Sequence, residues 1–424
     1  MQLEEYLHSL ETFGIKLGLL QTTELMTRAG YCPEPGKKPY FIHLAGSNGK
    51  GSTGAMLQKA LCNANFKTGF YTSPHLASFN ERFRINGEMI SDDELEEEFQ
   101  KLLPHAEAMR KEGKFVTYFE FTTVLALGYF LHQSTDFVIW ETGMGGRFDS
   151  TNVVIPAVSV ITNIALEHCQ YLGDTLGKIA FEKGGIIKEN VPVFCGIMPD
   201  EALSVLKGIA AEKNAPFNAV YEDFTPAEQK KRNILKTPSG EVELALYGSM
   251  QRRNFTLVYH VLQYLSSAFQ IDFSDMLNAM KHVSWPGRLQ LLPDGTVLDG
   301  GHNPDGINAL VEGLTELFPN EKFSFVFASF EDKDTRKCLE QLIPAANDFT
   351  FVPLGCDFRP SCPPERLQKM LSKLDGNFKN IKLCNSLKQV LDNEKNTCRR
   401  VICGSLYLLG EYFSCCGNDI LKKI

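Results

Sequence analysis

The sequence predicts an α/β protein with a P-loop N-terminal domain around a mostly parallel sheet and a smaller Rossmann-like α/β C-terminal domain. Short apolar runs alternate with longer helical patterns, which is typical of βαβ units. A chain of 424 residues is also too long for one ordinary core. A Pro-Gly turn at Pro286 and Gly287 separates two βα series, so we expect domains at residues 1–286 and 287–424.

The expected elements follow from apolar runs and their periods. The strands are expected at 40–45, 66–72, 136–141, 158–164, 296–299, 323–328, 349–353 and 400–403, and helices at 52–65, 119–132 and 175–183. The segment 222–248 differs, because Val242, Leu244 and Leu246 alternate with polar residues. It predicts a β-hairpin or meander instead of another crossover.

Composition excludes several classes of function. The chain is 43% hydrophobic and 22% charged, as folded globular proteins are. A net charge of -8 without a long run of Lys or Arg argues against a nucleic-acid partner. No apolar run approaches the roughly 18 residues of a membrane span, and the acidic start is neither a secretory nor a transit signal, so a cytoplasmic location is expected. The twelve cysteines include no CxxC pair, which argues against structural zinc and disulfides.

A candidate phosphate loop follows the first expected strand and opens a helix. Glycines there let backbone N–H groups turn toward phosphate oxygens, a lysine adds positive charge, and a hydroxyl can reach Mg²⁺. The match to GxxxxGK[ST] is imperfect, because Leu44 replaces the first glycine and Gly51 separates the lysine from the hydroxyls. An ordinary glycine-rich turn remains the alternative. The candidate ligand residues are Gly46, Asn48, Gly49, Lys50, Gly51, Ser52 and Thr53.

Polar residues also follow other expected strands. Glu141 ends one strand and precedes three glycines, where a Mg²⁺ ligand for phosphates would lie. His168 and Lys183 come later, but a lone histidine usually has a structural role and a lysine is usually a surface charge. Asp299-Gly-Gly-His302 and Ser405 end two strands of the second half, and together they suggest a site assembled between domains.

A series of motifs runs through the whole chain. They are GSNGKGS (46–52), TSPHL (72–76), RFRI (82–85), FEFTT (119–123), ETGMGGRFDSTN (141–152), LGDTL (172–176), EK (182–183), PGR (286–288), DGGHNP (299–304), KD (333–334) and GSLYLLG (404–410). In this order they closely resemble the folylpolyglutamate synthase and dihydrofolate synthase family of the Mur ligase superfamily.

The resemblance implies an ATP-dependent ligase of folate biosynthesis and one-carbon metabolism. Such enzymes transfer the ATP γ-phosphate to a carboxylate, and the amine of L-glutamate attacks the acyl phosphate and expels phosphate. The substrate implied is dihydropteroate or the γ-carboxylate of a reduced folate, so we expect a dihydrofolate synthase, bifunctional with folylpolyglutamate synthase. Its partners would be small molecules only, and a monomer is expected.

The resemblance also implies roles for single residues. Lys50 and the loop amides would hold the β- and γ-phosphates, and ATP and two Mg²⁺ are the implied cofactors. The implied metal ligands are Ser52, Ser73 and Glu141 for the first Mg²⁺, and Glu141, His168 and Lys183 for the second. In this superfamily the matching lysine is often carbamylated, which requires a neutral, low-pKa amine. Nucleotide contacts are implied for Asn254, Arg288, Asp299 and His302, glutamate contacts for His302 and Ser405, and pterin-side or loop contacts for Phe79, Arg82 and Asp149.

Four positions depart from the family pattern. Glu167 stands where Asp is common, Gly184 where Ala is usual, Met250-Gln251 where His-Gln is usual, and Gly301 where Ala is usual. None of them removes a metal ligand. Two other functions are alternatives. One is a Mur-type ligase of cell-wall precursors, for which a separate N-terminal domain has no room before residue 46. The other is a non-ligating P-loop nucleotide switch, which has no use for Asp299, His302 and Ser405.

Overall fold

A computed structural model of the chain describes residues 2–11, 18–228, 231–355, 359–374, 376, 380–393, 398–417 and 419–422. It divides into two compact units. Unit 1 comprises Met1–Pro74, Phe79–Phe224 and Arg253–Met280, and unit 2 comprises His75–Ser78, Thr225–Arg252 and Lys281–Ile424. The domain boundary expected at residues 286 and 287 stays a prediction.

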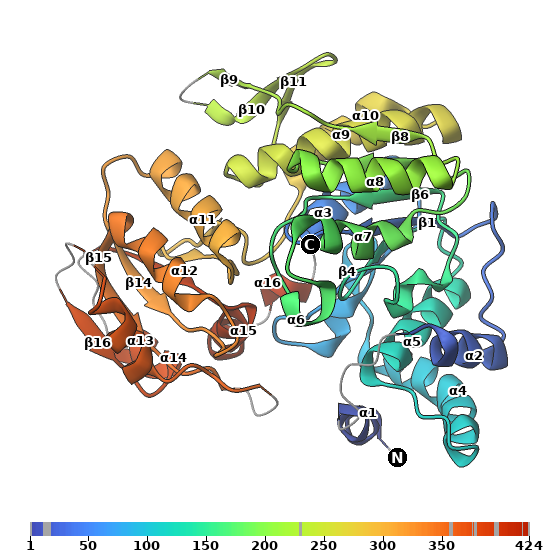
Figure 1. The fold of residues 1–424 in the computed structure, drawn as a ribbon, viewed down its shortest axis with the longest axis horizontal. Coiled ribbons are helices and arrows are strands. Elements are labelled where there is room, and N and C mark those ends of the chain that lie inside the picture. The colour runs from blue at the N-terminus through green and yellow to red at the C-terminus, as the bar shows by residue number, and fades with distance from the viewer. Residues whose placement is uncertain are drawn as a thin grey trace. The chain divides into compact units, whose positions relative to one another are not determined.

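Unit 1 is built on an eight-stranded sheet with the order β4-β3-β2-β5-β1-β6-β7-β8 (Figure 1). All neighbours are parallel except β2–β3 and β3–β4. The strands are β1 (Tyr40–Ala45), β2 (Thr68–Tyr71), β3 (Phe83–Ile85), β4 (Glu88–Met89), β5 (Phe137–Glu141), β6 (Val158–Ile161), β7 (Val193–Cys195) and β8 (Phe217–Ala219). Because β2, β5 and β6 are buried along their whole length, they appear in the sequence as continuous apolar runs.

Helices connect these strands in the βαβ manner expected from the sequence. They are α1 (Leu3–Glu11), α2 (Leu20–Ala29), α3 (Lys50–Asn63), α4 (Asp92–Lys111), α5 (Tyr118–His132), α6 (Cys169–Leu172), α7 (Leu176–Lys183), α8 (Asp200–Glu212), α9 (Ser249–Phe269) and α10 (Phe273–Asn278). Short 3₁₀ turns are η1 (Phe79–Arg82), η2 (Ser150–Val153), η3 (Gly184–Ile186) and η4 (Ala279–His282). The first four residues of α9 belong to unit 2 and the rest to unit 1.

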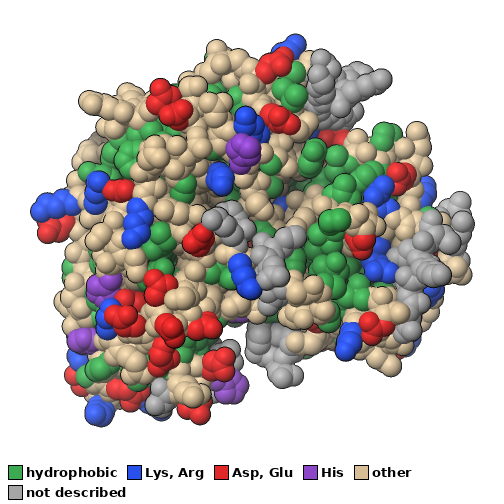
Figure 2. Space-filling view, turned by 180° about the vertical axis from the view of Figure 1, so that it is seen from behind, with side chains coloured by type: hydrophobic (Ala, Val, Ile, Leu, Met, Phe, Trp, Pro, Cys, Tyr) green, Lys and Arg blue, Asp and Glu red, His purple; other side chains and the backbone are tan. Residues whose placement is uncertain are grey.

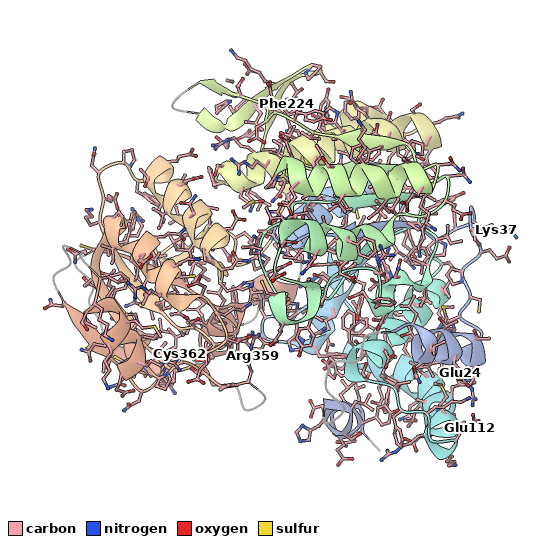
Figure 3. All side chains as sticks on the ribbon, viewed as in Figure 1. Glu24, Lys37, Glu112, Phe224, Arg359 and Cys362 are labelled. Atoms are coloured by element: carbon pink, nitrogen blue, oxygen red, sulfur yellow. The ribbon has the colours of Figure 1, made fainter. Side chains whose placement is uncertain are left out.

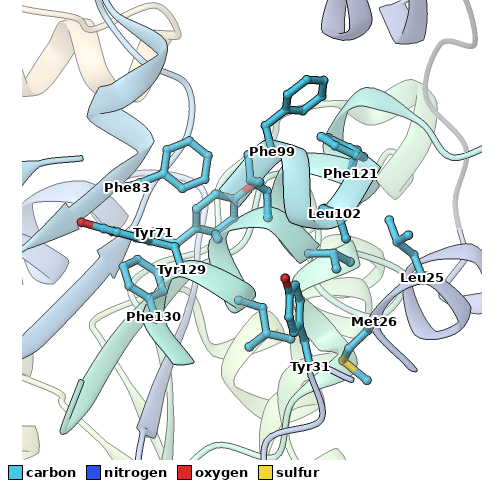
Figure 4. Close-up of a cluster of buried hydrophobic side chains, with 14 of the residues drawn as sticks. Leu25, Met26, Tyr31, Tyr71, Phe83, Phe99, Leu102, Phe121, Tyr129 and Phe130 are labelled. Atoms are coloured by element: carbon cyan, nitrogen blue, oxygen red, sulfur yellow. The ribbon is translucent and has the colours of Figure 1, made fainter. Parts of the chain in front are cut away.

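A large aromatic cluster packs α2, α4 and α5 beside the sheet (Figure 4). Tyr71 of β2 lies against Trp140 of β5, with ring centroids 4.9 Å apart. Phe121 of α5 meets the edge of Tyr6 of α1 at 4.9 Å. The Tyr71 hydroxyl is buried but is within hydrogen-bonding distance of the Thr122 hydroxyl, at 3.1 Å. This core includes side chains of β2 and β5, the strands whose carboxyl ends carry site residues.

Part of the net negative charge lies on α4, which carries none of the predicted site residues. Figure 2 shows acidic side chains gathered at the lower left, on the part of the molecule that holds α4. Glu24 of α2 and Glu112 after α4 lie near each other (Figure 3), and Arg28 binds both, at 2.5 and 2.6 Å. Such exposed pairs contribute little to stability. The overall charge therefore says little about the site.

Unit 2 contains a six-stranded sheet with the order β12-β13-β17-β14-β15-β16, parallel except for β12–β13. Its strands are β12 (Gln290–Leu291), β13 (Val297–Leu298), β14 (Phe323–Phe327), β15 (Ala346–Phe351), β16 (Ile381–Leu383) and β17 (Arg399–Cys403). Its helical elements are α11 (Pro304–Leu317), α12 (Thr335–Leu342), η5 (Ile343–Ala345), α13 (Pro364–Leu371), α14 (Leu387–Asn393), α15 (Leu406–Cys416) and α16 (Asp419–Lys422). The two sheets confirm the predicted α/β class.

The segment that alternates in the sequence forms a separate antiparallel sheet in unit 2. It consists of β9 (Pro226–Glu228), β10 (Lys231–Thr237) and β11 (Gly240–Glu243), in the order β11-β10-β9. The predicted meander is therefore confirmed. Among the helices that the structure describes, none is long and apolar enough to cross a membrane.

The start of α5 offers a test of how the core helices are stabilised. Thr117 and Glu120 form a buried capping box, in which the Thr117 hydroxyl accepts from the Glu120 N–H at 3.3 Å and the Glu120 carboxylate accepts from the Thr117 N–H at 2.7 Å. We expect Thr117→Ala to lower the free energy of unfolding by about 1 kcal/mol, measured by urea unfolding, because it leaves a buried N–H unsatisfied. Thr117→Ser is the control and should retain most of the stability. Equal losses for both variants would show that side-chain volume matters here and not the cap.

Candidate active site

The phosphate loop lies between β1 and α3 and is fastened to the end of β6. The Ser47 N–H donates to the Asn163 carbonyl at 3.0 Å, and the Asn48 N–H donates to the Asn163 side-chain oxygen at 2.7 Å. The Thr162 hydroxyl in turn donates to the Asn48 carbonyl at 2.6 Å. Residues that follow β6 therefore set the conformation of the loop that follows β1.

Gly49 ends the loop and precedes α3 with a left-handed conformation, φ 85°. A Cβ atom there would lie 2.4 Å from the Asn254 side-chain oxygen, so the position requires glycine. Asn254 is thus brought against the loop, where a nucleotide contact was predicted. No side chain caps α3, which leaves the first N–H groups of a 14-residue helix available to an anion.

The charged and hydroxyl groups of the loop are suited to phosphate and a cation. The Lys50 ammonium bends back to the Gly46 carbonyl at 2.8 Å. The hydroxyls of Ser52 and Thr53 are buried and make no hydrogen bond within the described part of the chain. A buried hydroxyl without a partner is costly, and a bound phosphate or metal ion would satisfy it.

Glu141 lies next to the loop because β5 pairs with β1, in a register that sets Leu44 opposite Glu141. The Thr142 N–H continues this pairing by donating to the Leu44 carbonyl at 2.9 Å. The buried Glu141 carboxylate accepts from the Thr72 hydroxyl at 2.5 Å. Ser73, predicted as a metal ligand, directly follows Thr72. The carboxyl ends of β1, β2 and β5 therefore meet at this edge of the sheet.

Lys183 is almost completely buried, as the resemblance implies: its side chain is only 2% exposed and pairs with Glu167 at 2.8 Å. Burial lowers the pKa of Lys183, and the charge of Glu167 opposes that shift. Burial alone would raise the pKa of Glu167, but the charges of Lys183 and Lys50 outweigh it and lower the pKa to about 2. The lysine is thus held in a dry position near the phosphate loop.

Two other predicted residues lie in the loops around Lys183. His168 has a left-handed backbone, φ 47°, and precedes α6, directly after Glu167. Asp149 accepts from the Met144 N–H at 2.8 Å, the Thr151 N–H at 3.0 Å and the Thr151 hydroxyl at 2.5 Å, and burial raises its pKa. These bonds make Asp149 the centre of the turn that follows Glu141.

The predicted pterin-side residues Phe79 and Arg82 lie together in η1. The Arg82 guanidinium carbon is 5.9 Å from the centre of the Phe79 ring and 5.5 Å from that of Tyr118. The Arg82 guanidinium therefore lies near two aromatic rings, and the residue is buried.

The remaining predicted residues belong to unit 2: Asp299 and His302 follow β13, Ser405 follows the neighbouring strand β17, and Arg288 precedes β12. The Asp299 carboxylate accepts from the Leu289 N–H and the Gly301 N–H, each at 2.8 Å, and burial raises its pKa. The His302 ring nitrogen Nδ1 lies 3.2 Å from the Gly300 carbonyl, and the Ser405 hydroxyl caps α15. Arg288 donates to the Gly287 carbonyl at 3.3 Å. The joint site between domains stays a prediction.

Two structural facts bear on the predicted metal sites. The described residues contain no group of three or more His, Cys, Asp or Glu side chains arranged to hold a metal ion. The predicted ligand set includes only two residues of these types, Glu141 and His168. Thr72, Thr162 and Asn163 also position the site. They were expected inside the strands at 66–72 and 158–164 and were given no role of their own, but β2 and β6 end directly before Thr72 and Thr162.

A phosphate loop beside a strand-end carboxylate and a buried lysine, within a parallel sheet, defines an ATP-binding α/β enzyme. Comparison with family models matches residues 44–261 to the Mur ligase middle domain and residues 287–402 to the Mur ligase glutamate ligase domain. The dihydrofolate synthase/folylpolyglutamate synthase of Bacillus subtilis is 37% identical over 361 residues, covering 82% of this chain and 83% of that protein.

Solved structures agree with this match. Folylpolyglutamate synthase of Mycobacterium tuberculosis, complexed with ADP and AMPPCP, superposes with a TM-score of 0.86 and 26% identity, covering 98% of each chain. Escherichia coli FolC in complex with DHPP and ADP has a TM-score of 0.83 and 26% identity, covering 98% of this chain and 97% of that one. The chain belongs to the folylpolyglutamate synthase/dihydrofolate synthase family of Mur ligases, and it is an ATP-dependent glutamate ligase.

The Glu167–Lys183 pair gives a prediction about stability. Removing one partner of a buried ion pair leaves the other charge uncompensated, so Glu167→Gln should lower the free energy of unfolding by about 3 kcal/mol. The measurement is urea unfolding of the metal-free protein at neutral pH. In the double variant Glu167→Gln/Lys183→Met the buried charge is gone, and most of the loss should be recovered. A double variant no more stable than Glu167→Gln would contradict the assignment of the loss to the stranded lysine.

Proposed function

We propose that the chain is bifunctional and joins L-glutamate both to dihydropteroate and to the γ-carboxylate of reduced folates through an acyl phosphate. The proposal rests on one observation. Lys50, Glu141 and the buried Lys183 all lie near the same phosphate loop. The substrates are inferred from relatives whose names include both activities. A cytoplasmic location and a monomeric state stay predictions.

The first chemical step transfers the γ-phosphoryl group of ATP to the substrate carboxylate. Little covalent chemistry is needed from the protein, because positioning and charge neutralisation dominate phosphoryl transfer. The N–H groups at the start of α3 and the Lys50 ammonium supply positive potential to the β- and γ-phosphates. Lys50 must leave the Gly46 carbonyl to do so, which costs one hydrogen bond and is offset by a charge-assisted bond to phosphate.

The second step is attack of the glutamate amine on the acyl phosphate. The C–N bond forms as the C–O bond to phosphate breaks, the amine loses a proton, and inorganic phosphate leaves. We propose Arg288, Asp299 and His302 as nucleotide contacts, and His302 and Ser405 as glutamate contacts. Asp299 already uses both oxygens for backbone N–H groups, so it has one further lone pair on each for a ligand donor.

We further propose that Mg²⁺ binds at Ser52, Ser73 and Glu141, and a second Mg²⁺ at Glu141, His168 and carbamylated Lys183. The ions would neutralise phosphate charge as it develops. The unpartnered Ser52 hydroxyl supports the first site. For the second, burial favours the neutral amine that CO₂ modification requires, and the resulting carbamate would be a carboxylate-like third ligand beside Glu141 and His168.

On the substrate side, Arg82 between Phe79 and Tyr118 suits a flat aromatic ligand with an anionic group. For Asp149 the loop contact is the better supported of its two predicted roles. Its carboxylate accepts three hydrogen bonds from residues 144 and 151.

The test of the proposed function is glutamate-dependent phosphate release with ATP and Mg²⁺, with products weighed by mass spectrometry. We expect turnover with dihydropteroate and with tetrahydrofolate, each product gaining one glutamyl residue. Turnover with only one acceptor would restrict the enzyme to one of the two activities. Phosphate release that does not depend on glutamate would contradict the proposal and favour a nucleotide switch.

Lys183→Ala tests the proposed role of the buried lysine. We expect turnover to fall at least about a hundredfold, with partial recovery on adding acetate, because a free carboxylate can replace a carbamate ligand. Lys178→Ala, on the same helix but exposed and paired with Asp174, is the matched control and should keep normal turnover. Undiminished turnover of Lys183→Ala would show the ligand assignment to be wrong.

A further inference from the structure

Arg147 joins the loop that follows Glu141 to the end of α7. Its backbone N–H donates to the Glu182 carbonyl at 2.8 Å, and its guanidinium donates to the Phe181 carbonyl at 3.0 Å. The guanidinium carbon also lies 3.9 Å from the centre of the Phe181 ring. One side chain thus makes a hydrogen bond and a cation–π contact with the same helix end.

The end of a helix is where such contacts have most effect. The last carbonyl groups of a helix have no partner within it, and a positive charge there is favoured by the helix dipole. The last residue of α7 is Lys183 itself. The Arg147 contacts therefore hold the turn of helix that sets where the Lys183 side chain begins.

A second set of contacts joins the same two segments. The Asn152 side-chain amide donates to the carbonyls of Arg147, at 3.0 Å, and Gly185, at 3.1 Å. A Cβ atom on Gly185 would lie 2.2 Å from the Arg147 Cα, so the two backbones meet at a distance that only glycine permits. The loop that follows Glu141 and the end of α7 are thus joined by hydrogen bonds and by a close backbone contact.

We propose that Arg147 is a positioning residue that fixes Lys183 relative to Glu141. The guanidinium contacts both the carbonyl and the ring of Phe181 at the end of α7, so the proposed action is through the position of this helix end. The inference rests on the proposed function only for the role of Lys183 as a metal ligand. Residues that orient metal ligands typically change metal affinity by about 10- to 100-fold when they are removed.

The experiment compares Arg147→Ala and Arg147→Lys with the wild type, using Mn²⁺ as the probe in the presence of ADP. We expect Arg147→Ala to weaken Mn²⁺ binding, measured by electron paramagnetic resonance, by about tenfold or more. The KM for dihydropteroate should stay within about twofold, because binding of that substrate is not changed. Arg147→Lys retains one donor, so its Mn²⁺ affinity should lie between those of the wild type and Arg147→Ala. Arg336→Ala, an exposed arginine in an i,i+4 pair on α12, is the control and should bind Mn²⁺ normally.

Hydrogen exchange of residues 181–186 separates this inference from the proposed function. Faster exchange in Arg147→Ala, together with weaker Mn²⁺ binding, supports the positioning role. Unchanged exchange and unchanged Mn²⁺ affinity in a folded Arg147→Ala protein would overturn it. If the wild type binds no Mn²⁺, the proposed metal site fails, and the exchange rates alone decide whether Arg147 holds α7. If Arg147→Ala does not fold, Arg147→Lys and Phe181→Leu carry the same comparison.

Discussion

The burial of the Lys183 ammonium group is the constraint on which the rest of the site depends. Moving an ammonium ion out of water costs several kcal/mol even after the protein relaxes, so its neighbours must compensate. Glu167 does so at 2.8 Å, and α7 is held by the loop that follows Glu141. These contacts join α7 to the segments that follow β5 and β6 around one buried nitrogen. An exposed lysine on the same helix, Lys178, needs none of them.

The parallel sheet provides the frame that makes this burial possible. β1 lies between β5 and β6, although about 95 residues separate β1 from β5 in the chain. Polar residues directly follow the last residues of β6, a neighbour of β1, and of β2, a neighbour of β5. Thr162 and Asn163 bind the phosphate loop, and Thr72 binds Glu141. The loop and the carboxylate are therefore preorganised by hydrogen bonds from side chains at rigid strand ends, which is how such ends give precise sites.

Longer apolar runs and the alternating segment 222–248 could be predicted from the sequence, whereas the three-residue strands β7 and β8 were not predicted. The strand at 40–45 was predicted with the observed bounds, whereas β6 ends at Ile161, because Thr162 and Asn163 turn their polar groups to the loop. α3 begins at Lys50, two residues before the predicted start. β8 has only three residues, none buried, so no apolar run marks it.

Most of the site residues could be predicted only from the family motifs and their order along the chain. The Glu167–Lys183 pair spans 16 positions and depends on the turn through α6, which no local pattern specifies.

The electrostatics of the ligand-free site explain why it should attract phosphate. Lys50 and Lys183 are close enough that the charge of Lys50 helps to lower the pKa of Lys183. Both lysines help to lower the pKa of Glu167 to about 2, so this carboxylate remains ionised at neutral pH. Glu167 pairs with Lys183, whereas the Lys50 ammonium donates to the Gly46 carbonyl. An anion at the start of α3 relieves the repulsion between the lysines and satisfies the buried hydroxyls of Ser52 and Thr53. The protein alone compensates these polar groups only in part. Nucleotide binding therefore supplies the partners that they lack.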